Sequence, residues 1–186
     1  MQEAGHSCKD FLTLIGTPDL PGLEATPRAG RLSLPELNRK LERFITETRP
    51  PAPRVPCLRS AALLWHDYLD ESHTISQEIR TADGSFLHAI MHRREPDYNN
   101  AKYWFRRVGT HPSFARIAAR AAGPLATDAG KNLVTRLAPQ GNWDPFAFVD
   151  VCEEAADRSS ADPTVRALML VQQVEFNCLL EHLFDV

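Results

Sequence analysis

The chain of 186 residues is long enough to bury one substantial hydrophobic core and fits a single domain. Hydrophobic residues make up 43% and charged residues 24% of the chain, a composition that excludes a disordered or fibrous protein. A formal net charge of -3 provides no basic surplus and argues against a general nucleic-acid-binding function.

The four cysteines are scattered, and no two of them form a CxxC pair. This spacing fits neither a zinc ribbon nor a small disulfide-linked scaffold, so we expect free, buried thiols. The first residues lack a basic segment followed by an unbroken apolar run, and no apolar stretch approaches the ~20 residues that span a bilayer. We therefore expect a cytoplasmic protein without a membrane partner.

Residues 1–32 contain several prolines and glycines, which predicts an irregular N-terminal arm with one short helix at most, ahead of a single helical domain at 33–186. Ser33 and Glu36 have the spacing of a capping box, and a helix is predicted from there to about Thr48. The segment RPPAPRVP (49–56) predicts an extended connector, because each proline fixes its backbone angle and removes a hydrogen-bond donor.

The stretch 58–79 predicts one long helix, because its apolar residues recur at the spacing of a single helical face. The dipeptide Asp83-Gly84 predicts a turn after it, and Ser85 is placed to cap a second helix over 86–95. Since a short turn joins these two helices, we expect them to pack antiparallel.

A third helix is predicted over 98–108, with Asp97 as its N-cap and Gly109 at its end. Four more are predicted at 114–123, around 128–137, at about 145–157 and at 163–184, the last two each opened by an aspartate and a proline. The last helix is apolar nearly all round, which predicts a central core helix and allows a homodimer interface. With no strand predicted, the expected fold is all-α, a single-domain bundle of about six to eight helices around the apolar C-terminal helix.

The segment PDYNNAKYWFRRVGTHP (96–112) resembles the second half of a tetratricopeptide unit. The matching positions are Tyr98, Ala101, Phe105 and Pro112 in this segment and Ala89 in the helix before it. Val108 stands where a small residue is usual, and His88 and His92 occupy positions that are usually apolar or aromatic. The match covers one helical hairpin, whereas a solenoid needs several stacked units. The resemblance therefore implies a tightly packed antiparallel pair and not a repeat protein.

The stretch from Ala61 to about Ser113, which contains WHDYLDESHTISQ and HAIMHRREPDYNNAKYWFRR, also resembles a family of small, uncharacterised bacterial proteins that are helical throughout. This resemblance implies a helical bacterial protein. It brings no activity, cofactor or catalytic residue with it.

Two polar stripes in this stretch carry groups that bind metals. The first is His66, Asp70, His73 and Gln77 in the predicted long helix, and the second is His88, His92 and Glu95 in the next helix. If the stripes face each other, the imidazoles and carboxylates are suitable ligands for Zn, Mn or Fe, and the candidate ligands are His66, Asp70, His73, His88, His92 and Glu95. The alternative is that the stripes are solvated faces, or that His88 and His92 are half-buried and hydrogen-bonded to carboxylates.

A second group of residues is cationic and aromatic. On the predicted helix 98–108 one face carries Asn100, Tyr103, Trp104 and Arg107. Arg94 and Arg107 could hold a carboxylate or phosphate through paired donors, with the two aromatic rings as stacking walls. The alternative is that the arginines pair with nearby acids, namely Glu71, Glu78, Glu95 and Asp97, while the aromatic rings fill the core.

Three functions are compatible with these residues. The first is a helical domain whose pocket, lined by His, Arg and aromatic residues between the helices at 58–80, 86–95 and 98–108, binds a small anionic ligand. The second is a metal-dependent enzyme of the hydrolase or oxygenase type. The third is a protein-protein interaction module that displays Tyr103, Trp104 and Arg107. The density of polar groups beside large aromatic residues favours the pocket, because a purely structural hairpin does not need them.

Overall fold

The computed structural model describes residues 8–127 and 130–185, and the regular secondary structure of these residues is entirely helical. The helices are α1 (Cys8–Ile15), α2 (Leu34–Thr48), α3 (Val55–Trp65), α4 (Leu69–Ser76), α5 (Ala82–Arg94), α6 (Tyr98–Val108), α7 (Ser113–Ala121), α8 (Lys131–Leu137), α9 (Pro145–Glu154) and α10 (Pro163–Asp185), with short 3-10 turns at Ala52–Arg54 and Pro139–Gly141. The all-α prediction is confirmed, although the described residues form ten α-helices where about six to eight were expected.

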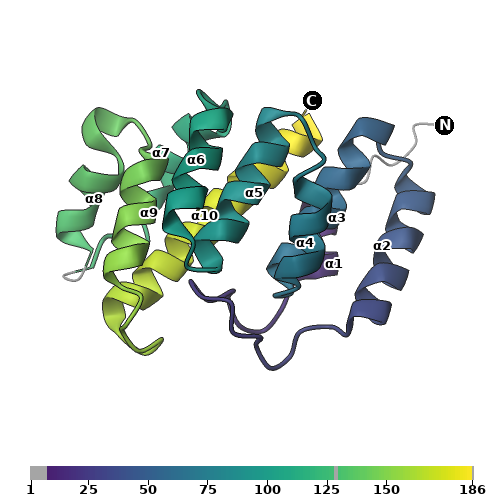
Figure 1. Ribbon diagram of the computed structural model, residues 1–186, viewed down its shortest axis with the longest axis horizontal. Coiled ribbons are helices and arrows are strands. Elements are labelled where there is room, and N and C mark those ends of the chain that lie inside the picture. Colours follow the sequence, from purple (N-terminus) through teal and green to yellow (C-terminus); the bar gives the residue numbers. More distant parts are fainter. Residues whose placement is uncertain (1–7, 128–129, 186) are drawn as a thin grey trace.

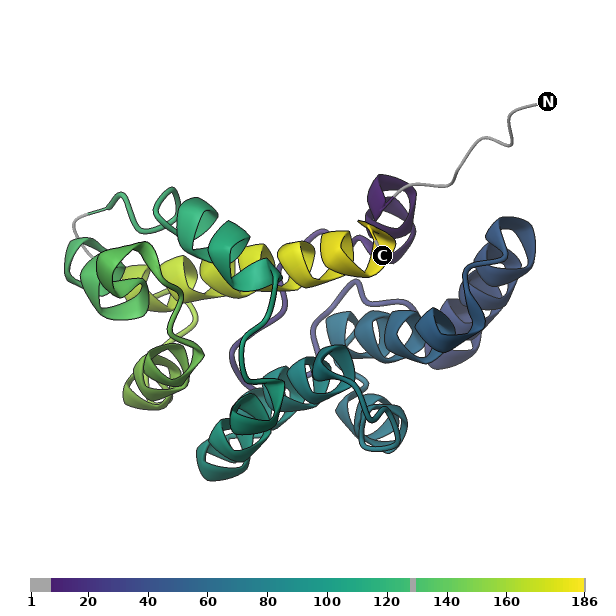
Figure 2. The same ribbon diagram turned by 90° about the horizontal axis from the view of Figure 1, so that it is seen from above.

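Helix α10, with 23 residues, forms the centre of the molecule. Figures 1 and 2 show it crossing behind α5 and α6, with α1 beside its C-terminal end. Its side chains contact several other helices. The ring of Phe176 lies 5.0 Å from that of Trp65 on α3, and Glu175 forms an ion pair with Arg93 on α5 at 2.6 Å. The prediction of a central C-terminal core helix is therefore confirmed.

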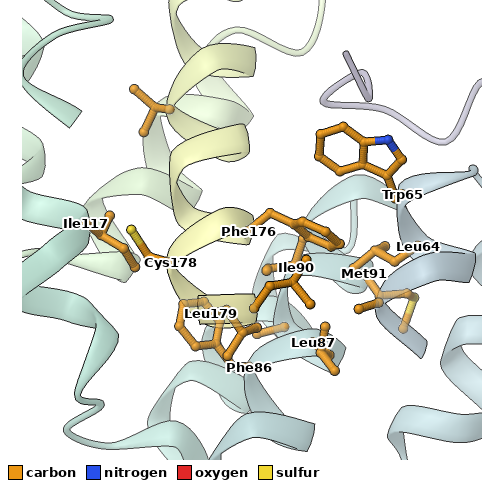
Figure 3. Packing of buried hydrophobic residues seen from close by; sticks show 14 of the residues in the cluster. Leu64, Trp65, Phe86, Leu87, Ile90, Met91, Ile117, Phe176, Cys178 and Leu179 are labelled. Atoms are coloured by element: carbon orange, nitrogen blue, oxygen red, sulfur yellow. The ribbon is translucent and has the colours of Figure 1, made fainter. Parts of the chain in front are cut away.

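The central part of the hydrophobic core lies where α3, α5, α7 and α10 meet. Figure 3 shows Leu64 and Trp65 from α3, Phe86, Leu87, Ile90 and Met91 from α5, Ile117 from α7, and Phe176, Cys178 and Leu179 from α10. On α5 every residue from Gly84 to Arg94 is buried. Because buried polar groups need hydrogen-bond partners, the polar residues of α5 must find theirs on neighbouring helices.

The long helix predicted over 58–79 is wrong, because the chain breaks into α3 and α4 at residues 66–68. Asp67 adopts a left-handed backbone conformation with φ of 62°, which aspartate tolerates better than most residues. Its buried carboxylate accepts hydrogen bonds from Arg94 at 2.6 Å and from the backbone and side chain of Arg28 at 3.0 and 2.9 Å. These distant partners stabilise the break, and it divides the predicted His66–Gln77 stripe between two helices.

The start of α5 also differs from the prediction. The helix begins at Ala82, with the Thr81 hydroxyl accepting a hydrogen bond from the Gly84 backbone N–H at 3.2 Å, so Asp83-Gly84 lies in the first helical turn and Ser85 is not the cap. A Cβ atom at Gly84 would lie 2.5 Å from the carbonyl oxygen of Ile79. Glycine is therefore needed here for a close approach of α5 to Ile79 in the connector that follows α4.

Other predicted boundaries divide into confirmed and corrected ones. Asp97, Asp144 and Asp162 cap their helices through side-chain hydrogen bonds, and Gly109 ends α6 with φ of 64°. Ser33 precedes α2 but makes no side-chain capping bond, so the capping box is wrong. The connector 49–56 is not extended throughout, because it contains a 3-10 turn and α3 already begins at Val55. The predicted helix start at Asp128 lies outside the described residues.

The surface of α10 bears on the predicted homodimer. Its apolar residues are covered by other helices of the same chain, and Leu170, at 38% exposed, is the large hydrophobic residue of α10 that remains open among those described. The apolar character of this helix is thus explained by its place in the core. Among the described residues, no helix combines the length and the apolar character that crossing a bilayer requires.

Candidate metal centre

The candidate site lies where α4, α5 and α6 pack together. Helices α5 and α6 run antiparallel, since the ring of Phe86 lies 5.5 Å from that of Phe105 and His88 lies 4.0 Å from Trp104. Helix α4 packs on the same part of α5, with Ser76 beside His88. The expected close antiparallel hairpin is present, and the side chains between these three helices include three histidines.

His73 from α4 and His88 and His92 from α5 form one cluster, called here the histidine cluster. One ring nitrogen from each histidine lies within 4.8 Å of those of the other two. The Nε2 atoms of His88 and His92 are 2.8 Å apart, and the His73 ring centroid lies 4.7 Å from that of His88 and 5.2 Å from that of His92. Three imidazoles therefore converge on one small volume.

A serine contacts the outer nitrogen of His88. The Ser76 hydroxyl lies 2.9 Å from His88 Nδ1 and 3.3 Å from the carbonyl oxygen of His73, and it serves Nδ1 as donor or as acceptor according to the tautomer of the ring. In the tautomer in which the hydroxyl donates to the His73 carbonyl and accepts from Nδ1, His88 Nε2 presents a lone pair to the centre of the histidine cluster.

Acidic groups orient His92 in the same way. Its Nδ1 lies 3.2 Å from a carboxylate oxygen of Glu95 and 4.0 Å from one of Asp97, so Nδ1 is the favoured position for its proton. The side-chain amide nitrogen of Asn100 lies 3.0 Å from His92 Nε2 and 3.4 Å from His92 Nδ1. The Nε2 atoms of His88 and His92 form a hydrogen bond at 2.8 Å, and the tautomers of the two rings decide which of them donates. Partners on the outer nitrogens of two converging imidazoles are also what orients histidine ligands at metal sites.

Burial keeps the two α5 histidines neutral. His88 is 1% and His92 is 6% exposed. Burial, with neighbouring His92 and His73 adding to it, lowers the pKa of His88 to about 3. The pKa of His92 is also lowered, chiefly by burial and then by His73, against the opposing charge of Asp97. Neutral imidazole is the form that binds a metal ion, so no proton has to be removed at neutral pH.

The rim of the histidine cluster is acidic. Burial raises the pKa of Glu95, the charge of His73 opposes this, and the charges of Asp70 and Asp97 raise it further. Glu95 and His73 are half-buried, and Asp70 and Asp97 are exposed. Three carboxylates at the open side of three imidazoles create an electrostatic field that attracts cations.

An aromatic wall closes another side of the histidine cluster. Trp104 stacks on His88 with 39° between their planes, and the exposed ring of Tyr103 meets Trp104 edge-on at 5.6 Å. The guanidinium of Arg107 lies 5.2 Å from the centre of the Trp104 indole. The predicted face of α6 is therefore beside the histidine cluster, with Trp104 in contact and Tyr103 and Arg107 outside it.

His66 and Asp70 do not lie among the nitrogen ligands, although both were candidates. His66 is the C-cap of α3 and is fully buried, and its Nδ1 accepts a hydrogen bond from the Leu32 backbone N–H at 3.2 Å. Burial, with the charge of Arg28 adding to it, lowers its pKa to about 4. Asp70 lies at the rim and is exposed. The break at Asp67 explains the position of His66, because this residue no longer lies on one helix with His73.

Arg94 lies away from Arg107 and cannot share an anion with it. Its guanidinium donates to Asp67 at 2.6 Å and to the backbone carbonyls of Leu64 at 2.6 Å and Gly22 at 3.0 Å. Arg93 pairs with Glu175 on α10. The acidic partners predicted for Arg94 from the sequence are therefore wrong, because Arg94, like Arg93, points into the core towards long-range partners.

A second titratable cluster, not expected from the sequence, joins Asp83, His111 and His182. His111 Nε2 lies 2.9 Å and His182 Nε2 lies 3.5 Å from the same Asp83 oxygen. His111 Nδ1 accepts hydrogen bonds from the Ser113 backbone N–H at 3.2 Å and is 2.6 Å from its hydroxyl, so Nε2 carries the proton and donates to Asp83. This tautomer offers no lone pair at Nε2. The three residues lie far apart in the sequence, so no local sequence pattern predicts that they form a cluster.

Comparisons with other proteins add no functional assignment. No protein-family model, curated protein or solved structure matches this chain.

Proposed function

We propose that this protein is a metal-dependent enzyme of the hydrolase type, in which His73, His88 and His92 bind one divalent transition-metal ion. The observation that carries the proposal is the pair of Nε2 atoms of His88 and His92, 2.8 Å apart. Ser76 and Glu95 lie at their Nδ1 atoms, so each ring has an outer partner in the tautomer that leaves Nε2 unprotonated. A divalent ion would then take the place of the proton that the two Nε2 atoms share, and the acidic rim favours such a cation.

Zinc fits this set of ligands best. Zn–N bonds of about 2.0–2.1 Å in tetrahedral geometry place two ligand nitrogens about 3.3 Å apart, so the His88–His92 pair has to open by only about 0.5 Å. His73 lies on the half-buried side and supplies the third nitrogen by a change in its side-chain rotamer. Iron and manganese also accept imidazole, and they remain alternatives that the same experiment distinguishes.

Three protein ligands leave the fourth position of a tetrahedral ion for water, which is the pattern of catalytic zinc sites. A bound zinc ion lowers the pKa of such a water towards 7, and a neighbouring carboxylate can accept its proton. Glu95 is the candidate for this role because it is half-buried at the rim of the histidine cluster. Its carboxylate would have to turn from His92 Nδ1, which it contacts at 3.2 Å, towards the ion-bound water. An anionic ligand, which the sequence favoured for these helices, has weaker support. Arg94 pairs with Asp67 instead, and the rim of the histidine cluster is acidic.

Metal content is the decisive measurement. Tag-free protein is dialysed against trace Zn, Mn and Fe and analysed for bound metal, next to the His88→Ala/His92→Ala variant and a His182→Ala control. We expect close to one zinc per chain in the wild type and the control and none in the double variant. Circular dichroism establishes that all three proteins are folded. Absence of metal from the wild type, or unchanged metal in the folded double variant, would refute the proposal.

A further inference from the structure

A cavity of about 450 Å³ lies between residues 19–29 of the N-terminal arm and the first half of α10. It shares no lining residue with the histidine cluster. Its walls include Asp19, Leu20 and Glu24 from the arm and Arg166, Met169 and Leu170 from α10. The volume falls within the range of about 300–1,000 Å³ that is typical of small-molecule sites.

Buried charges hold the arm side of this cavity in one conformation. The carbonyl oxygen of Gly22 accepts hydrogen bonds at 3.0 Å from both Arg94 and Gln172. At the other end of the cavity wall, the backbone N–H of Arg28 donates to Asp67 at 3.0 Å. Burying charged side chains is unfavourable unless they gain such partners, so their use to fix an irregular loop indicates a preformed site.

Opposite charges line the two walls without meeting. The carboxylates of Asp19 and Glu24 and the guanidinium of Arg166 form no ion pair or side-chain hydrogen bond with any residue that the structure describes. Arg28 contributes no free charge, because its Nε donates to Asp67 and its terminal nitrogens to Thr17 and to backbone carbonyls. The cavity therefore separates an acidic wall from a basic one, and these walls match a ligand that carries both charges.

The remaining surface of the cavity is apolar. Leu170 is 38% exposed and lies beside Met169 and Leu20. A second cavity of about 90 Å³ shares Gly22, Glu24, Ser160 and Met169 with the first, and its other walls include Leu23 and Val165. These side chains give the cavity an apolar surface that an aliphatic ligand group can cover, and the smaller cavity offers space for a second such group.

We propose that this cavity binds a short peptide as a zwitterion, with its ammonium group at Asp19 and Glu24 and its carboxylate at Arg166. Aliphatic side chains of the peptide then cover Leu20, Met169 and Leu170. Paired charged hydrogen bonds fix the direction of the peptide, and the apolar surface supplies affinity.

The dipeptide Leu-Leu tests the proposal by isothermal titration and by mapping of amide chemical shifts, with Leu-Leu amide and N-acetyl-Leu-Leu as probes that each lack one charge. We expect saturable binding of Leu-Leu with shifts at residues 19–29 and 160–170. Arg166→Gln is expected to weaken Leu-Leu binding about tenfold and to leave Leu-Leu amide binding unchanged. Asp19→Asn/Glu24→Gln is expected to have the corresponding effect on Leu-Leu but not on N-acetyl-Leu-Leu.

The substituted residues are exposed, so we expect the variants to fold. Arg43→Gln on α2 is the matched control, because the Arg43 side chain is 79% exposed and does not line the cavity. Absence of saturable Leu-Leu binding would overturn the proposal. An equal loss for Leu-Leu and its amide in Arg166→Gln would overturn it as well, because the peptide carboxylate would then not be the group that Arg166 binds.

Discussion

His88 and His92 face each other through their Nε2 atoms at 2.8 Å, one helical turn apart on α5. Each ring also contacts a residue outside the pair. Ser76 on α4 contacts His88, and Glu95 at the end of α5 contacts His92. The two nitrogens share one hydrogen-bonded proton at this distance, and a bound metal ion would take its place.

The metal-free protein is expected to lose stability between pH 7 and 5. In the folded chain the pKa of His88 is lowered to about 3 and that of His66 to about 4, whereas both are near 6.5 in the unfolded chain. The unfolded state therefore binds more protons as pH falls, and the free energy of unfolding decreases by about 2 kcal/mol for each histidine between pH 7.5 and 5. Urea unfolding in the presence of a chelator measures this decrease.

Carboxylates do not account for a loss in this pH window. The pKa of Asp67 is lowered, because hydrogen bonds from Arg28 and the charge of Arg94 outweigh burial, so its contribution is lost only near and below pH 4. A free energy of unfolding that stays constant from pH 7 to 5 would contradict the burial of two neutral histidines.

Glu95→Gln is expected to separate metal binding from catalysis. The amide keeps the shape of the side chain but cannot accept the proton of a metal-bound water, so hydrolysis of 4-nitrophenyl acetate should fall by about 10²-fold or more. Zinc content should stay close to that of the wild type, and Glu78→Gln, an exposed change on the segment after α4, should alter neither property. If Glu95→Gln also loses its zinc, Glu95 is a ligand and not a base.

Asp67→Asn is expected to lower the free energy of unfolding by about 3–5 kcal/mol, because it leaves the buried guanidinium of Arg94 without its counter-charge. Asparagine tolerates the left-handed backbone conformation of this position, so the change tests the charge and not the backbone. Urea unfolding gives the energy, and limited proteolysis should show faster cleavage in residues 16–33. Glu47→Gln, which removes an exposed pair with Arg43, is the control and should have an effect below about 1 kcal/mol. A similarly small effect of Asp67→Asn would mean that Arg94 finds another partner.

Gly84→Ala is expected to affect both stability and metal affinity. The added Cβ would overlap Ile79 at 2.4 Å and force α5 away from the connector that follows α4, three residues after Ser76, which contacts His88. We expect a loss of about 1–3 kcal/mol in the free energy of unfolding and weaker zinc binding in a competition titration. Gly123→Ala is the matched control, since its nearest contact of 3.6 Å is an ordinary one. Equal behaviour of the two variants would argue against the close approach at Gly84.

Local rules identified much of the fold and part of the candidate site. Aspartate followed by proline opens α9 and α10, Asp97 caps α6, and the four-residue spacing of His88 and His92 places them on one face of α5. These features depend on backbone geometry over one or two turns, which the sequence alone specifies. The apolar character of the last helix likewise predicted its central place.

Only the tertiary structure decided which polar groups meet. Asp67 ends α3 because Arg28, 39 residues away, and Arg94, 27 residues away, converge on its carboxylate, and this break removes His66 from the site and leaves His73 in it. The cavity between the arm and α10 joins segments about 150 residues apart through Gln172 and Gly22. Periodicity records which side of a helix is apolar, but a buried charge is stable only beside its partner, and the folded chain alone brings the two together.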